Sequence, residues 1–105
     1  MELLTEELIK IFKEHPLGCT EKYEVCGDTP ILAHYFLPNW DWYVTEAEKQ
    51  DDGDWLIFGY VKGFANEFGY FTLRQLKSIT GPLGLGVERD LYPTHKTLKD
   101  VGVDF

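Results

Sequence analysis

The sequence predicts an α+β fold: a small antiparallel β-meander of about four or five strands, with an N-terminal helix and short C-terminal helices packed on the sheet. Twelve of the sixteen aromatic residues lie between Tyr35 and Phe71, in apolar segments separated by turn residues, as in consecutive strands. Helix-capping patterns stand on both sides of this region. With 105 residues and 44% hydrophobic content, the chain is expected to form one domain, residues 1–105, around its own core.

The first expected element is a helix over residues 5–14. Thr5 is its expected N-cap, and two glutamates follow in the first turn, where the helix dipole favours negative charge. Since so short a helix is marginal alone, its apolar stripe must pack on another element. That stripe comprises Leu4, Leu8, Ile11 and Phe12. Turn residues dominate from Pro16 to Pro30, with one short edge strand expected at 23–25.

Four strands are expected in the aromatic-rich region. They cover residues 32–38, 41–47, 55–62 and 68–71. The pair Asp52-Gly53 between the second and third strands is a strong hairpin signal. The third strand is apolar on both faces, which is typical of a central strand covered on both sides, or of a curled sheet.

Two short helices are expected after the meander. Thr72 and Gln75 form a capping box, and the helix that follows turns three apolar residues to the core: Leu73, Leu76 and Ile79. Residues 81–93 are rich in glycine and leucine and then charged, and they are expected to be extended. Thr97 with Asp100 is expected to cap a last helical turn.

The net charge of −8 argues against direct binding of nucleic acid, which needs Lys and Arg at the phosphates, and against an anionic membrane surface. The sequence shows no secretory signal and no apolar run of membrane-spanning length, so a soluble, cytoplasmic protein is expected. Cys19 and Cys26 are then expected to be free thiols. No nucleotide-binding or catalytic motif is present, and no cofactor is expected.

An acidic run with aromatic neighbours is the first candidate site. Residues 41–54 carry six carboxylates against Lys49 alone, a net charge of −5. A solvated hairpin tip and a buried aromatic core explain this pattern in structural terms. The functional interpretation is a surface that binds a basic protein, or that imitates the charge of nucleic acid. Its candidate partner-binding residues are Trp40, Trp42, Asp51, Asp52 and Asp54.

A group of carboxylates and a histidine is the second candidate site. In an extended segment Glu88 and Asp90 point to one side and Arg89 to the other. Arg89 is expected to form a structural ion pair. If the segment pairs beside the meander, the two acids would join Asp41 or Glu46 and could hold a metal or a small ligand. The candidate ligand or metal residues are His34, Asp41, Glu88 and Asp90; a structurally satisfied His34 is the alternative.

Four tracts carry a family resemblance: AHYFLPNWDWYVTE (33–46), IFGYVKGF (57–64), EFGYFTL (67–73) and GPLGLGVERDLYP (81–93). In this order they resemble a small bacterial domain-of-unknown-function family that occurs in phages, plasmids and conjugative elements. The resemblance covers residues 31–98, and the GPLGL–ERDLY tract is its most specific part. It implies a cytosolic protein linked to mobile DNA, and it supplies no catalytic residues.

The function expected from these observations is a non-enzymatic protein-interaction module. Two alternatives stay open: a metal-dependent hydrolase or small-ligand-binding domain that uses the carboxylate and histidine group, and an accessory domain of a DNA-processing complex. The expected partner is an unidentified protein, and the chain itself is expected to be a monomer or a weak homodimer.

Overall fold

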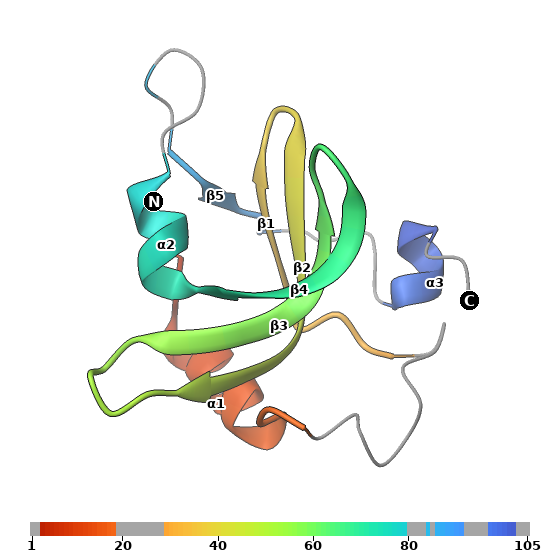
Figure 1. The fold of residues 1–105 in the computed structure, drawn as a ribbon. Helices are drawn as coiled ribbons and strands as arrows, with labels where there is room; N and C mark the ends of the chain where they lie inside the picture. Colours follow the sequence, from red (N-terminus) through yellow and green to blue (C-terminus); the bar gives the residue numbers. More distant parts are fainter. Residues whose placement is uncertain (1–2, 19–28, 80–83, 85, 92–96, 103–105) are drawn as a thin grey trace.

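The computed structural model describes residues 3–18, 29–79, 84, 86–91 and 97–102, and it confirms the α+β prediction (Figure 1). In chain order the elements are α1 (Glu6–Glu14), β1 (Ala33–Leu37), β2 (Trp40–Lys49), β3 (Trp55–Lys62), β4 (Asn66–Thr72), α2 (Leu73–Ser78), β5 (Glu88–Arg89) and α3 (Leu98–Val101). The edge strand expected at 23–25 lies outside the described residues.

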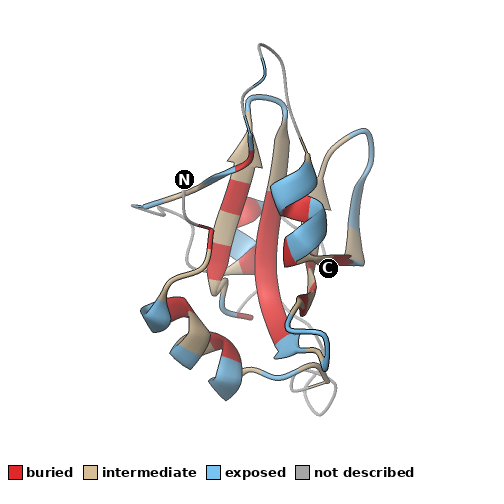
Figure 2. Cartoon of the chain, turned by 90° about the vertical axis from the view of Figure 1, so that its left-hand side faces the viewer, coloured by how far each residue is buried: buried red, intermediate tan, exposed pale blue. Residues whose placement is uncertain are grey.

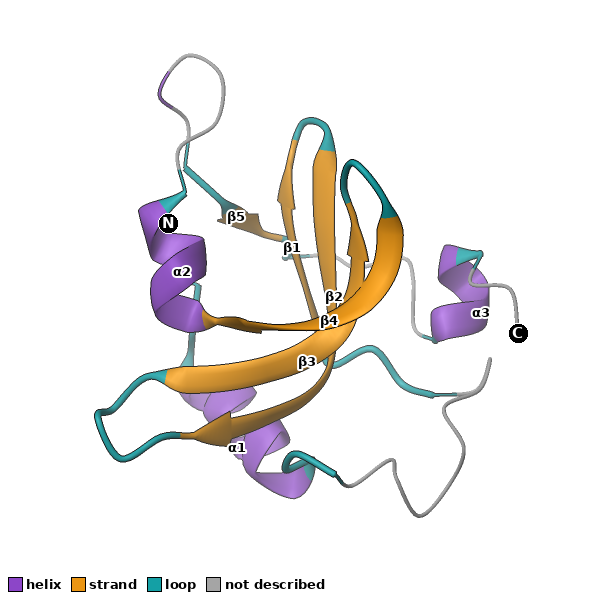
Figure 3. Ribbon diagram, viewed as in Figure 1, coloured by secondary structure: helices purple, strands orange, loops and turns teal. Residues whose placement is uncertain are grey.

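All strand pairings are antiparallel, and the sheet order is β4-β3-β2-β1-β5 (Figure 3). The first four strands form the expected meander. β4 is longer than predicted, because its pairing with β3 continues from Thr72 as far as the polar residues Glu67 and Asn66. Within the described residues of the segment expected to be extended, Glu88 and Arg89 form β5 and pair with Phe36 and Tyr35 of β1.

The expected caps are present. The Thr5 hydroxyl accepts a hydrogen bond from the N–H of Leu8, at 3.2 Å, at the start of α1. At α2 the Thr72 hydroxyl and the Gln75 side chain each accept from the other residue's N–H. Local sequence therefore decides where these helices begin.

Helices α1 and α2 lie against one face of the sheet, called here the inner face, and α3 lies on the opposite side (Figures 1 and 2). Phe12 of α1 is fully buried and packs on Trp55, with 5.6 Å between ring centroids. Leu73 and Leu76 of α2 are buried in the same core. Burying a side chain of this size contributes about 1.5–3 kcal/mol, so each of these core residues adds substantially to the stability of the fold.

The opposite, outer face is only partly covered. Leu98 and Val101 of α3 and Tyr43 of β2 are buried, but they lie outside the main core cluster. The Lys62 ammonium donates to the carbonyl oxygen of Val101 at 2.7 Å and ties α3 to β3. None of the described helices is long and apolar enough to cross a membrane.

A β-bulge in β2 was not predicted. Val44 pairs with Gly59, but Glu46 pairs with Phe58, so Thr45 is an extra residue on β2. The bulge turns both Val44 and Ala47 to the core, although they are three residues apart. It also accompanies the pronounced curvature of β3 and β4 in Figure 1, in agreement with the curled sheet that the apolar third strand indicated.

Candidate functional site

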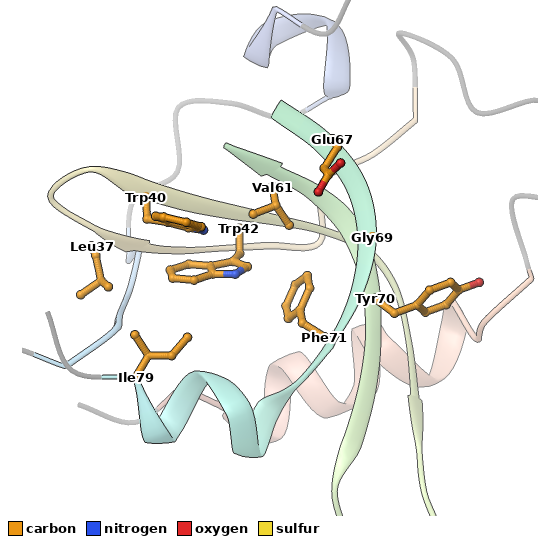
Figure 4. A pocket seen from close by; sticks show the side chains of 9 residues that line it. All are labelled: Leu37, Trp40, Trp42, Val61, Glu67, Gly69, Tyr70, Phe71 and Ile79. Carbon is orange, nitrogen blue, oxygen red and sulfur yellow. The ribbon is translucent and has the colours of Figure 1, made fainter. Parts of the chain in front are cut away.

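An open apolar pocket lies on the inner face of the sheet, beside α2 (Figure 4). Its volume is about 390 Å³. The strands β1 to β4 and the residue after α2 contribute its apolar side chains, which are Leu37, Trp40, Trp42, Val61, Phe71 and Ile79. The bend of the sheet brings these side chains together, since they come from positions as far apart in the sequence as 37 and 79.

The two tryptophans are held in place by their surroundings. Their ring centroids are 6.2 Å apart, at an interplanar angle of 29°. A Cβ at Gly63 would overlap the indole of Trp40, so glycine lets this ring lie against the backbone of the β3–β4 turn. Phe64 is 99% exposed and stands edge-on to Trp40, 4.9 Å away. An exposed aromatic side chain thus extends the apolar surface beyond the pocket.

The β4 side of the pocket has a different character. Glu67 supplies the one carboxylate among the described residues that line the pocket, and it is solvent-exposed. Gly69 supplies no side chain, and a Cβ built there meets nothing within 4 Å. Figure 4 shows the ring of Tyr70 pointing away from the pocket, so its backbone is what lines the wall. The pocket is therefore open at Gly69 and negatively charged next to that opening.

Sequence reasoning named Trp40 and Trp42 as partner-binding residues but missed the β4 side. The available signal was the alternation in EFGYFT, residues 67–72. It places Phe68 and Tyr70 on one face and a carboxylate, a glycine and Phe71 on the other. A glycine between inward-facing residues of a strand indicates a place where another group approaches closely.

Three of the four predicted ligand or metal residues meet on the outer face. The His34 ring lies between two carboxylates: Nε2 is 2.7 Å from Oδ1 of Asp41, and Nδ1 is 3.0 Å from Oδ2 of Asp90. The Tyr43 ring stacks on the imidazole with 4.4 Å between centroids. Glu88 lies apart from this group: it pairs with Phe36 across the ladder and is exposed.

The His34 cluster joins three segments of the chain, β1, β2 and the residue after β5. Both ring nitrogens are engaged by carboxylates, and only 11% of the His34 side chain is exposed. Within the part of the chain that the structure describes, no three His, Cys, Asp or Glu side chains are placed to hold a metal ion. Burial, together with the charges of Asp41 and Asp90, raises the pKa of Tyr43 to about 12, so its hydroxyl stays protonated at neutral pH.

Arg89 lies across the ladder from Tyr35. Burial raises the pKa of Tyr35 well above its ordinary value, and the Arg89 charge partly offsets this. The Tyr35 hydroxyl donates to the carbonyl oxygen of Leu3 at 2.6 Å, which ties the N-terminal segment to the sheet.

The acidic turn lies at the other end of β2 from the tryptophans. Trp40 begins this strand and Lys49 ends it, so the turn is about 30 Å away along the strand. The Asp52 carboxylate is 3.3 Å from the Arg74 guanidinium, and both side chains are largely exposed. The Asp54 carboxylate accepts from the N–H of Arg74 at 3.0 Å. The predicted partner-binding residues thus fall into two separate regions.

Asp54 carries a pH-dependent prediction. Partial burial works to raise its pKa, but hydrogen bonds from the N–H groups of Trp55 and Arg74, together with the Arg74 charge, outweigh this and hold the pKa below its ordinary value. Such a carboxylate stabilises the fold above its unfolded-state pKa of about 3.9, and the contribution is lost as the pH falls through the lower, folded-state pKa.

Asp54→Ala is therefore expected to lower the free energy of unfolding by about 1 kcal/mol at pH 7, with a smaller difference below pH 4. Urea denaturation of both proteins across this pH range measures the effect. Asp51→Ala, at an exposed position in the same turn, is the control. An equal loss at pH 7 and at pH 3 would contradict the assigned role of the charge.

Comparison with known protein families identifies one related family. The sequence profile of a family described as "Protein of unknown function (DUF2958)" matches residues 3–100. This match includes the N-terminal helix, which the four quoted tracts do not. Comparison with curated proteins and with solved structures yields no match.

Proposed function

Because the chain belongs to the DUF2958 family of proteins of unknown function, we propose its function from the geometry of its surface: it is a protein-binding module. The pocket lined by Trp40, Trp42 and Phe71 receives a bulky apolar side chain of the partner. The observation that carries this proposal is the continuity between the open pocket and the fully exposed Phe64 beside it.

The composition of the pocket supports a protein partner. Binding hot spots on proteins are rich in tryptophan and consist of preformed apolar pockets that exclude water. Trp42 is 5% exposed and the Trp40 indole lies against Gly63, so both rings are already in place before a partner binds. Fewer degrees of freedom are then lost when the complex forms.

A small molecule fits this surface less well. Sites for small ligands combine an apolar lining with several converging polar groups that fix orientation. Here Glu67 is the one charged side chain among the described lining residues. Phe64 and Trp40 lie at the edge of the pocket, where a partner surface covers them and a small ligand leaves them in water.

The contacts of the other candidate residues also favour the pocket. Asp52 pairs with Arg74, and Asp54 accepts from the N–H of Arg74 in the first turn of α2, so these carboxylates already stabilise the fold. Both nitrogens of His34 are engaged by carboxylates, so neither is free to act as a general base in hydrolysis or to bind a metal ion.

The experiment is a selection of random linear peptides against the immobilised protein, followed by affinity measurements on variants. Gly69→Phe directs a side chain into the pocket from a position where a Cβ has open space. Selected peptides are expected to bind this variant about tenfold more weakly or worse. Asp51→Lys, in the distant acidic turn, is the matched control and is expected to leave the affinity unchanged.

Two outcomes would contradict the proposal. One is the absence of any peptide whose binding depends on the pocket. The other is the reverse pattern, in which Asp51→Lys abolishes binding and Gly69→Phe does not; this would assign the interaction to the acidic turn. Thermal denaturation of each variant establishes that the fold is retained, and Gly69→Leu supplies a smaller side chain if Gly69→Phe is destabilised.

A further inference from the structure

Resting on the proposed function, we propose the mode of binding and the chemistry of the partner. A partner segment adds to the sheet as an extended strand along the outer edge of β4. It places a bulky apolar side chain opposite Gly69, in the pocket, and a Lys or Arg two residues away, beside Glu67.

The edge of β4 is regular and long. β4 ends the sheet, and in the described part of the chain β3 is the only strand paired with it. Its seven residues stay in register with β3 from Asn66 to Thr72, without a bulge. In an antiparallel pair, alternate residues direct their N–H and C=O groups away from the partner strand, so β4 presents a row of such groups at its outer edge.

Protection of this edge is weak. Edge strands of soluble proteins are commonly guarded by lysine, proline, a bulge or extreme shortness. The β4 sequence NEFGYFT contains no lysine and no proline, and its only charged residue is Glu67. An exposed edge of this kind is a template for another strand.

The pocket adjoins this edge at Gly69. Glu67, Gly69 and Phe71 line the wall of the pocket (Figure 4). A strand added to β4 continues the same face about 4.8 Å further out. Since Gly69 contributes no side chain and a Cβ there meets nothing within 4 Å, the side chain opposite it can reach across the glycine into the pocket. Aromatic residues opposite edge glycines stabilise sheets in this way.

Charge indicates the second feature of the partner. Glu67 is exposed and lies two residues from Gly69, on the same face of β4. A partner residue two positions from the one in the pocket therefore lies beside this carboxylate. The chain's net charge of −8 also favours encounter with a basic segment. The expected partner motif is an aromatic or large aliphatic residue with Lys or Arg two residues away.

A second copy of the chain fits the edge less well than a basic partner. In an antiparallel pair of two β4 strands centred on Gly69, each glycine faces the other and both pockets stay empty. A pair centred on Glu67 sets two carboxylates opposite each other, which is destabilising. A pair centred on Tyr70 sets Phe71 opposite Gly69, but β4 contains no Lys or Arg, so no antiparallel register of two β4 strands places a positive charge beside Glu67.

The test uses a short acetylated and amidated peptide of serine and threonine, with a central Phe and an Arg two residues away on each side. The two arginines serve both strand directions. Binding is measured by fluorescence anisotropy. We expect Glu67→Lys to weaken binding about tenfold or more, and a peptide with Glu in place of both arginines to recover the loss on this variant. Glu48→Lys makes the same charge change at an exposed position in β2 and is the matched control.

Backbone pairing is tested separately. Methylation of single peptide nitrogens is expected to weaken binding at every second position, because a strand directs alternate N–H groups to its neighbour. Amide hydrogen exchange in Asn66–Thr72 is expected to slow when the peptide binds.

The outcomes separate this inference from the function on which it rests. Selected peptides could need the pocket and yet be sensitive to N-methylation at every third or fourth position, or at no position. This result would overturn strand addition and leave the proposal of a protein-binding module intact. If no peptide depends on the pocket, both are overturned. Slow exchange in β4 without peptide, together with a dimer in sedimentation, would assign the edge to a second copy and overturn the basic partner.

Discussion

Gly59→Ala is expected to destabilise the fold by about 3 kcal/mol or more, a large fraction of the about 5–15 kcal/mol that is typical of a folded domain. Gly59 lies opposite Val44 at the bulge of β2. A Cβ there would overlap the carbonyl group of Tyr43. The clash is with main-chain atoms of the neighbouring strand, so no side-chain rotation relieves it, and the two strands would have to separate.

Gly69→Ala is the matched control, because Gly69 lies directly across the β3–β4 ladder from Gly59. A Cβ at Gly69 meets nothing within 4 Å. The free energy of unfolding of this variant is expected to lie within about 1 kcal/mol of the wild-type value. A small increase is expected because alanine restricts the unfolded chain more than glycine does. Chemical denaturation measures both variants. An equal loss of stability in the two variants would show that it comes from replacing any glycine of these strands and not from the contact with Tyr43.

His34→Ala is expected to lower the free energy of unfolding by about 2–4 kcal/mol. The imidazole joins Asp41 of β2 to Asp90, which follows β5. Without it, the carboxylates of Asp41 and Asp90, which are 34% and 27% exposed, lose their contacts with the imidazole and repel each other. The N–H of Asp90 also donates to the His34 carbonyl oxygen at 2.9 Å, so the junction of β5 with β1 weakens as a unit.

Two measurements test the prediction for His34→Ala. Chemical denaturation gives the loss of stability, and amide hydrogen exchange is expected to accelerate at Glu88 and Arg89 more than in β3. In the double variant His34→Ala/Asp90→Asn, removal of one charge is expected to recover part of the loss. The pair Asp52–Arg74 gives the scale for an exposed contact, since it is worth about 0–1 kcal/mol. A loss no larger than this for His34→Ala would contradict the role of the cluster.

Part of the candidate site could be predicted from the sequence. Trp40 and Trp42 were named from their place in an aromatic-rich strand. From the sequence, the approach of Glu88 and Asp90 to Asp41 or Glu46 depends on whether their segment pairs beside the meander. The structure meets this condition for Asp90 but not for Glu88, because the register of β5 on β1 sets Glu88 opposite Phe36, whereas Asp90 follows β5 and lies beside His34.

The sequence by itself determined the local structure. Thr5, Thr72 and Asp100 satisfy the free backbone groups at the helix starts, and Asp52-Gly53 turns the chain between β2 and β3. These features depend on hydrogen bonds and backbone angles within a few residues, and neighbouring residues therefore suffice to predict them.

Only the tertiary structure decided the pocket, the bulge and the separation of the two predicted halves of the binding surface. The bulge at Thr45 depends on how β2 lies against β3, and the pocket depends on the resulting bend, which brings Leu37 and Ile79 to the same space. The pocket is open at Gly69 because none of the neighbouring described atoms comes within 4 Å of where a Cβ would lie. Such features arise from contacts between residues distant in the chain, and a single sequence does not reveal which of them meet.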